Sequence, residues 1–292
     1  MTSRRLTRAL VLLLVTALLV AGCGLSATPT PVPPPQTLRL ATTTSTADTG
    51  LLDGILPAFE KANNCKVDVV AVGTGQAIEI GRKGDADVLL VHARASEDLF
   101  VKDGFAVARY DVMYNDFILV GPKSDPAGAA GKDLAKDAFK AIMEKQATFV
   151  SRSDKSGTHT KELSVWSSIS VTPTTSMTWY NAIGQGMGDT LIFANEKQGY
   201  TLSDRGTYLA MRDKLPNLVV IVGGDNLANN KDKALLNPYG VLPVNPEKYP
   251  SVNSKLATAF VAWITSAETQ KAIGDFGAEK FGQPLFYPSA AK

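Results

Sequence analysis

The stretch on which both the fold and the site depend reads FVSRSDKSGTHTKEL, residues 149–163. An apolar segment that ends at Val150 predicts a buried strand, and apolar residues from Leu163 onward recur at helical spacing. The loop between them supplies hydrogen-bond donors and a flexible backbone, namely Arg152, Ser156, Gly157 and Thr158. A strand that leads into a helix through such a loop directs backbone N–H groups and the positive end of the helix dipole at one place. The loop therefore predicts a site for a compact anion, with an ordinary capped helix as the alternative.

Two further strand-to-helix turns carry hydroxyls and glycines. Thr42–Thr46 follows the apolar segment Leu38–Ala41, and Gly73–Gly75 follows a second buried strand predicted at Val67–Val72. In an open parallel sheet, ligands bind beyond the carboxyl ends of the strands, where these turns must lie. Gly73–Gly75 lacks the ending of a nucleotide-binding P-loop, so alone it indicates only a tight turn. We expect four residues of these turns to bind the anion together with the first loop: Thr44, Ser45, Thr74 and Gly75.

The N-terminus carries a targeting signal. A basic start is followed by the apolar run Ala9–Ala21, which is too short to span a bilayer comfortably, so residues 1–22 are predicted to be a signal peptide. Val20–Cys23 resembles the signal box of bacterial lipoproteins, which implies cleavage before Cys23 and lipidation of that residue. A plain secretory signal with an incidental cysteine is the alternative. Residues 23–36 then form the lipidated cysteine and an extended, proline-rich tether.

Charge and cysteine content exclude several classes of function. Removal of the signal peptide removes three arginines and no acidic residue, which changes the formal net charge from +2 to −1. The sequence therefore shows no basic footprint for nucleic acid. If Cys23 is lipidated, Cys65 has no partner for an intrachain disulfide, and its role stays open. With only two histidines and no cysteine cluster, no metal site is predicted.

Strand-like and helix-like segments alternate from Thr37 onward. Strands are predicted at Asp87–Val91, Phe117–Val120, Val219–Val222 and Tyr239–Val244, in addition to those before the first two turns. Helices are predicted at residues 50–59, 76–81, 96–102, 137–144, 163–168, 189–198 and 205–214, with two more within 255–276. The alternation predicts an α/β fold in which a mostly parallel sheet is covered by helices on both faces.

The combined motifs are similar to those of a known family. They are Ala41–Thr46, Gly73–Ala77, Gly84–Ala93, Met113–Phe117, Ser151–His159, Gly184–Gly188 and Tyr200–Tyr208. Together they resemble the tungstate-binding proteins of bacterial ABC importers, and the resemblance covers essentially all of residues 37–286.

The resemblance implies a type II periplasmic-binding-protein fold with two lobes, each a mostly parallel sheet flanked by helices. Two crossover strands, expected at Asp116–Val120 and Tyr239–Val244, would join the lobes around a cleft that closes on an oxyanion. Lobe 1 would then comprise residues 37–115 and 244–292, and lobe 2 residues 116–243.

The function that the resemblance implies is capture of tungstate, or of molybdate, and its delivery to an ABC permease. The protein would be extracytoplasmic, anchored to the cell membrane through lipidated Cys23, monomeric, without a cofactor and not an enzyme.

His92 marks a departure from more distant phosphate-binding relatives. Those relatives share the spacing of Arg152 to Ser156–Thr158, and they also have a carboxylate just after the third strand, near the position of His92. A carboxylate there would repel a fully ionised oxyanion, whereas a histidine would not. An indirect, structural role is expected for His92, although Asp85 and Asp154 are near enough in sequence to leave phosphate open.

Three other functions remain as alternatives. The anion could be molybdate, phosphate or sulfate within the same fold. A hydrolase could use Ser156 with His159, but the chain lacks the Gly-x-Ser-x-Gly nucleophile elbow. A surface adhesin or scaffold would leave the three donor loops unexplained.

Overall fold

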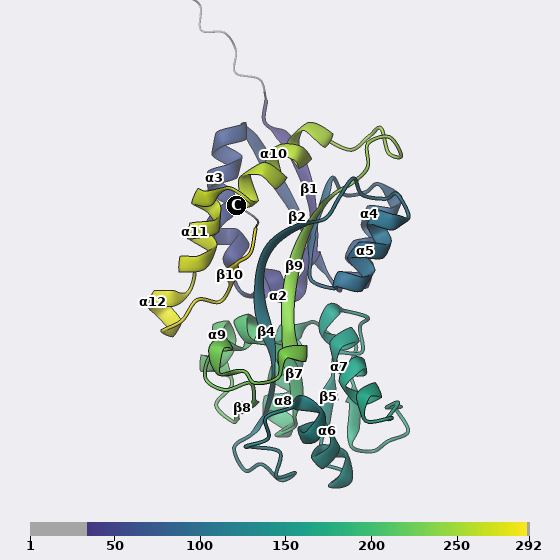
Figure 1. Ribbon diagram of the computed structural model, residues 1–292, viewed down its shortest axis with the longest axis vertical. Coiled ribbons are helices and arrows are strands. Elements are labelled where there is room, and N and C mark those ends of the chain that lie inside the picture. The colour runs from purple at the N-terminus through teal and green to yellow at the C-terminus, as the bar shows by residue number, and fades with distance from the viewer. Residues whose placement is uncertain (1–33, 291–292) are drawn as a thin grey trace, which may run out of the picture. The chain divides into compact units, whose positions relative to one another are not determined.

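The computed structural model describes residues 34–290, which form mixed α/β structure (Figure 1). The predicted signal peptide, Cys23 and the tether up to residue 33 lie outside the described residues. Within residues 34–290, no helix is both long enough and apolar enough to cross a membrane.

An eight-stranded sheet runs through the structure. Its main path follows the order β10-β4-β9-β3-β1-β2, and β7 and β8 pair with the C-terminal half of β4. The strands are β1 Gln36–Thr43, β2 Cys65–Val72, β3 Val88–Val91, β4 Tyr110–Pro122, β7 Thr201–Asp204, β8 Leu218–Val222, β9 Leu236–Pro243 and β10 Tyr287–Pro288. A separate parallel pair joins β5 Phe149–Ser151 to β6 Tyr180–Ala182.

Helices surround the strands in two groups (Figure 1). The first group contains α2 Thr44–Asp48, α3 Leu51–Asn63, α4 Thr74–Lys83, α5 Arg94–Lys102, α10 Ser254–Ile264, α11 Ala267–Asp275 and α12 Ala278–Phe281. The second contains α6 Ala135–Glu144, α7 Gly157–Ser168, α8 Met187–Lys197 and α9 Arg205–Met211. Each helical segment predicted from the sequence overlaps at least one of these helices.

β4 and β9 are the two strands that pass between the groups (Figure 1). They pair antiparallel, from Tyr110 opposite Val241 to Asp116 opposite Leu236. Both predicted crossovers therefore fall on paired strands, but β4 is longer than predicted because it already begins at Tyr110.

The sheet is more mixed than the mostly parallel arrangement predicted from the sequence. β1 pairs in parallel with β2 and β3, whereas β9 pairs antiparallel with both β3 and β4. The reason is that β4 leaves the first group of elements and β9 returns to it, so the two strands run in opposite directions. Alternation of strands and helices predicts parallel neighbours only where a helix carries the chain back to the same edge, as it does for β1 to β3.

β2 is largely exposed, although a buried strand was predicted there. β2 is the edge strand at one end of the sheet, and its residues Val69 and Val70 are 36% and 39% exposed. A short apolar run cannot distinguish a central strand from an edge strand, because both keep apolar side chains on the covered face.

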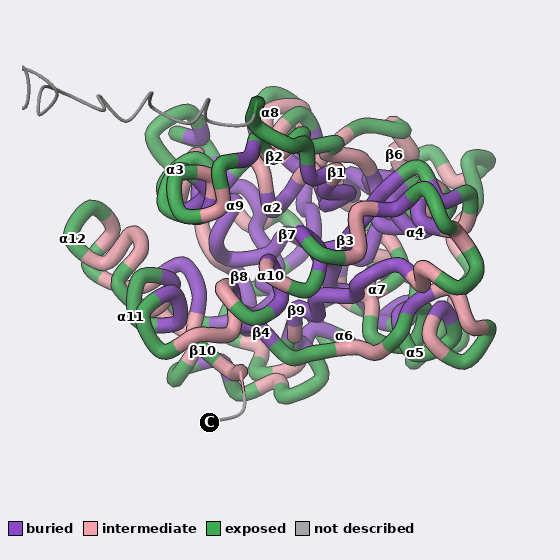
Figure 2. Tube along the Cα trace, turned by 90° about the horizontal axis from the view of Figure 1, so that it is seen from above, coloured by how far each residue is buried: buried purple, intermediate pink, exposed green. Residues whose placement is uncertain are grey.

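Buried residues follow the strands and the helix faces that pack on them (Figure 2). In the second group the core is aromatic: the Trp166 ring lies 5.1 Å from Phe149 and 4.5 Å from Phe139, between ring centroids. These contacts hold β5 against α7, the two elements that flank the loop of residues 152–156. The aromatic core therefore holds both ends of this loop in place.

Candidate anion-binding site

The first part of the candidate site is the N-terminal turn of α2, which belongs to the first group of helices. The Thr43 hydroxyl caps this helix by accepting a hydrogen bond from the Thr46 backbone N–H at 3.2 Å. Thr42–Thr46 was expected to be a loop, but Thr42 and Thr43 complete β1 and Thr44 begins α2. The strand can turn directly into the helix because the Thr43 side chain replaces the missing backbone partner. Thr44 and Ser45 consequently lie in the first turn of α2.

The start of α4 meets the start of α7. α4 begins at Thr74 rather than at residue 76 as predicted, which places Thr74 and Gly75 in its first turn. The Thr74 hydroxyl accepts from the Gly157 N–H at 3.0 Å, and the Gly75 N–H donates to the Lys155 carbonyl at 3.4 Å. Loops that are about 80 residues apart in the chain are thus in direct contact.

α7 begins with a hydroxyl cap. Ser156 accepts from the His159 backbone N–H at 3.2 Å, and the His159 ring accepts from the Lys155 N–H at 3.1 Å. These contacts occupy the Ser156 oxygen and a ring nitrogen of His159 separately, so they do not form the nucleophile–base pair that a hydrolase needs.

Arg152 is the buried cation of the site. Its side chain is 1% exposed, and its Nη2 donates to the Thr44 hydroxyl at 3.0 Å and to Asp154 at 2.6 Å. Among the buried polar atoms that lack a hydrogen-bond partner within residues 34–290 are Arg152 Nε, Arg152 Nη1 and the Thr158 hydroxyl oxygen. Buried polar groups are almost always satisfied, so these atoms, two of which belong to one guanidinium, are candidates to bind a polar ligand.

The hydroxyls around Arg152 share one pattern. Thr44 accepts from Arg152, Thr74 accepts from Gly157, and Ser156 accepts from His159. Each hydroxyl oxygen accepts a hydrogen bond from a protein N–H, and its own proton is available for donation to an anion.

Asp154 places a carboxylate at the edge of the site. One oxygen accepts from Arg152, and the other accepts from the Ser156 N–H at 3.1 Å. Its side chain is 15% exposed. The sequence left the role of Asp154 open, and the structure assigns it to the orientation of Arg152 and of the loop.

His92 contacts the side chains at the start of α2. Its Nε2 is 3.1 Å from the Thr43 and the Ser45 hydroxyl oxygens, and its Nδ1 is 3.0 Å from the Asn237 side-chain oxygen. The ring stacks on Tyr239 with centroids 4.5 Å apart. Burial lowers the pKa of His92 to about 4, although the Asn237 hydrogen bond opposes this shift. The imidazole is therefore neutral at neutral pH. If Nδ1 carries the proton for Asn237, Nε2 accepts from a hydroxyl of α2.

The His92 contacts support the indirect role expected from the sequence. They tie the hydroxyls of α2 to Asn237 on β9, and Asn237 in turn donates to Asn115 on β4 at 2.7 Å. The side chains at the first turn of α2 are thus connected to both strands that cross between the groups. Whether these residues bind an anion remains a prediction.

A fourth helix start, which the residue types did not reveal, also borders the site. A Cβ atom on Gly186 would lie 3.4 Å from the Thr44 hydroxyl oxygen, and the Gly188 N–H donates to Asp48 at 3.2 Å. Residues 184–188 contain neither a hydroxyl nor a cationic side chain, so a search for those groups passes over them. Their glycines, which were part of the family resemblance, were the available signal.

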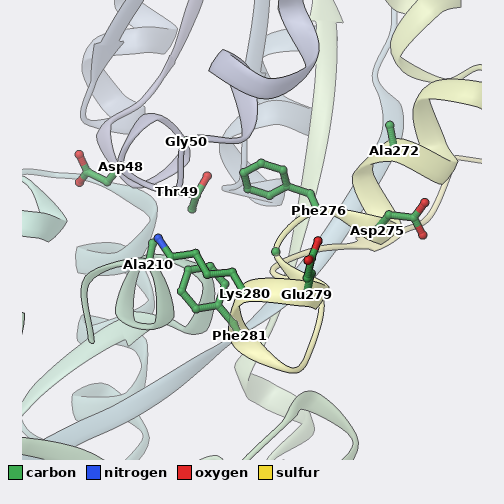
Figure 3. Close-up of a pocket in the computed structure, with 11 residues that line it drawn as sticks. Asp48, Thr49, Gly50, Ala210, Ala272, Asp275, Phe276, Glu279, Lys280 and Phe281 are labelled. Carbon is green, nitrogen blue, oxygen red and sulfur yellow. The ribbon is translucent and has the colours of Figure 1, made fainter. Parts of the chain in front are cut away.

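A cavity of about 850 Å³ lies where the end of α2 and α9 meet α11 and α12 (Figure 3). Figure 3 shows Asp48 and Thr49 on one side of this cavity and Asp275 and Glu279 on the other. With three carboxylates and one lysine, Lys280, in its lining, it disfavours an anion. Size alone therefore does not identify the site.

Metal-ligating residues do not cluster in the part of the chain that the structure describes: no group of three or more His, Cys, Asp or Glu side chains is placed to hold an ion. Cys65 is buried and is not in a disulfide.

The chain is similar to known proteins in sequence and in fold. A family model described as a PBP superfamily domain matches residues 28–268. The tungstate-binding protein TupA of Peptoclostridium acidaminophilum is 50% identical over 253 residues, which cover 86% of this chain and 85% of that protein.

Two solved structures are similar in both sequence and fold. The crystal structure of the tungstate ABC transporter from Geobacter sulfurreducens has 52% identity and a TM-score of 0.73, covering 82% of this chain and 98% of that chain. The tungstate-binding protein TupA from Desulfovibrio alaskensis G20 has 46% identity and a TM-score of 0.71, covering 88% and 100%.

Proposed function

Because this chain belongs to the periplasmic-binding-protein (PBP) superfamily, we propose that it captures tungstate between two lobes and delivers it to the permease of an ABC importer. It is a homologue of the TupA proteins, whose names state that they bind tungstate. It acts outside the cytoplasm, as a monomer, and performs no chemical step on its cargo. The lobes are residues 37–115 with 244–292, and residues 116–243.

The observation that carries the proposal is the set of unpartnered donors around Arg152. Two guanidinium nitrogens and the Thr158 hydroxyl are buried without a partner. An unsatisfied buried group costs about 1–3 kcal/mol, and more if it is charged. A tetrahedral oxyanion placed there would satisfy all three. Its remaining oxygens would accept from the other proposed ligand residues, Thr44, Ser45, Thr74, Gly75, Ser156 and Gly157.

The arrangement of donors also predicts which anions bind. Thr44, Thr74 and Ser156 already accept hydrogen bonds from protein N–H groups, so each presents its proton to the ligand. Tungstate and molybdate are fully deprotonated at neutral pH and can accept from every direction. Hydrogen phosphate would direct one O–H at donors, at a cost of about 1–3 kcal/mol. Sulfate is fully ionised but smaller, so some donors would not reach it.

We therefore expect tungstate and molybdate to bind tightly, sulfate weakly and phosphate least. Calorimetric titration of the protein with each of the four anions measures this order. Phosphate that competes with tungstate at comparable concentration would contradict the proposed ligand class, since it would mean that Asp154 or another acceptor receives the phosphate proton.

A second expectation concerns the membrane anchor, which lies outside the described residues. Lipidation of Cys23 would hold the protein at the outer face of the cell membrane through the tether of residues 23–36. Cys23→Ala removes the lipidated thiol, so we expect the variant to leave the membrane fraction while its tungstate affinity stays unchanged. Immunoblots of membrane and soluble fractions measure the first effect, and calorimetry the second. A variant that stays with the membrane would contradict the anchor but not the binding function.

A further inference from the structure

Glu162 is a buried carboxylate that the proposed function leaves unexplained. It lies in α7 and its side chain is almost inaccessible, with the residue 2% exposed. Three donors surround it: the Ser151 hydroxyl at 2.7 Å on Oε2, and the Tyr180 hydroxyl at 2.7 Å and the Trp166 Nε1 at 3.2 Å on Oε1. Burial raises the pKa of Glu162 to about 7, against the opposing effect of these hydrogen bonds.

Ser151 connects Glu162 to the loop that carries Arg152. The Ser151 hydroxyl donates to Glu162 and accepts from the Ser153 backbone N–H at 3.2 Å. Arg152 lies between Ser151 and Ser153 in the chain. The position of its backbone is therefore set by a hydrogen bond that Glu162 holds in place.

The loop needs such support because its backbone is strained. Ser153 has φ +49° and Lys155 has φ +60°. Both values lie in the left-handed region, which residues other than glycine rarely adopt. Strained residues persist only where surrounding contacts over-determine them, and they concentrate at ligand sites. The Ser153 N–H bond to Ser151 is one of the contacts that hold the first of these residues.

We propose that Glu162 is a positioning residue for the anion site: through Ser151 it holds the Arg152 loop in the conformation in which the guanidinium meets the ligand. The inference rests on the proposed function, because it assigns Glu162 a role in the same site.

The chemistry of the contact requires a carboxylate rather than an amide. Ser151 has one proton, which it gives to Oε2, and it receives the Ser153 N–H on a lone pair. In Glu162→Gln, the side-chain oxygen can still accept from Tyr180 and Trp166, but the amide nitrogen then faces the Ser151 hydroxyl. Ser151 must accept from both sides, and its own proton loses its acceptor. The substitution thus disturbs the loop with almost no change in volume.

The test compares tungstate affinity and thermal stability in matched variants. Glu162→Gln is expected to weaken tungstate binding about tenfold or more, because the loss of a hydrogen bond to a charged group propagates to Arg152. Asp125→Asn is the control. The Asp125 carboxylate likewise accepts a hydrogen bond from a buried tyrosine hydroxyl, that of Tyr200 at 2.6 Å, and it also accepts from two backbone N–H groups. It should lower the melting temperature by a similar amount and leave affinity unchanged.

Coupling to Arg152 separates positioning from a general loss of stability. In an Arg152→Lys background, Glu162→Gln should weaken binding much less than it does in the natural chain, because the group that it positions is already lost. Equal effects in both backgrounds would overturn the inference. If Glu162→Gln does not fold, Ser151→Ala provides the same test, since it removes only the bridge and leaves Tyr180 and Trp166 on Glu162.

The outcomes distinguish the two proposals. Absence of tungstate binding by the natural protein would overturn the proposed function itself. Tight binding by the natural protein with equal affinities in Glu162→Gln and Asp125→Asn would overturn only the role of Glu162.

Discussion

Arg152→Lys is expected to weaken tungstate binding by about 100-fold, because two charge-assisted hydrogen bonds of about 1.5–3 kcal/mol each are replaced by the partial reach of one ammonium. Arg152 holds Thr44 and Asp154 with Nη2 and keeps Nε and Nη1 unpartnered and buried. A lysine retains the positive charge but has neither the planar fork nor the length to serve both sets of partners. The loss therefore measures geometry rather than charge.

Titration of the variant with tungstate measures this effect, and Arg39→Lys is the matched control. Arg39 also holds a carboxylate with two nitrogens, at 3.2 and 2.6 Å from Asp87, but it lies toward the opposite end of β1 from Thr44. The control variant should bind tungstate as the natural protein does. Nearly unchanged affinity in Arg152→Lys would remove Arg152 from the site.

His92→Asp is also expected to weaken tungstate binding strongly. His92 is 4% exposed, and its Nε2 lies 3.1 Å from the Ser45 hydroxyl oxygen in the first turn of α2. A carboxylate beside Ser45 would repel a dianion bound at the first turn of α2 and would oppose binding by a few kcal/mol at an effective dielectric constant of about 20. Neutral imidazole imposes no such repulsion.

The pH dependence separates repulsion from loss of packing. Burial will raise the pKa of the introduced carboxyl, so it is neutral at low pH and ionises as the pH rises. The affinity of His92→Asp should therefore fall relative to that of His92→Asn as the pH increases from about 5 to about 8. Tungstate titrations of the two variants across that range measure the difference. If the two variants bind alike at every pH, the side chain at position 92 is not close to the ligand.

Much of the fold could be predicted because its signals are local. The apolar segments before residues 42, 73 and 152 mark strands, and hydroxyls or glycines follow each one. Helices begin at Thr44, Thr74 and Gly157, within or beside the predicted turns. Thr74 follows β2 of the large sheet and Gly157 follows β5 of the separate pair, so their contact depends on how the two groups pack and not on one sheet edge.

Predictions failed where the outcome depended on neighbours in space. β2 reads as a buried strand but lies at the edge of the sheet, because no further strand covers its outer side in the described structure. The sheet is mixed because β4 and β9 travel in opposite directions between the groups, which no local pattern records. Gly186 borders Thr44 although its segment contains no hydroxyl.

The family and the fold class could be read from the sequence alone, and so could the three turns where polar groups gather. These depend on residue types and short spacings, which the chain carries directly. What surrounds each polar group follows from the packing of elements that are distant in the chain. This packing set Asp154 and Thr44 on one nitrogen of Arg152, buried Glu162 behind Ser151, and joined His92 to Asn237 across 145 residues. Hydrogen bonding, burial and the resulting pKa shifts depend on distances of a few ångströms between residues that are remote in the chain, so they emerge only when the strands and helices have packed.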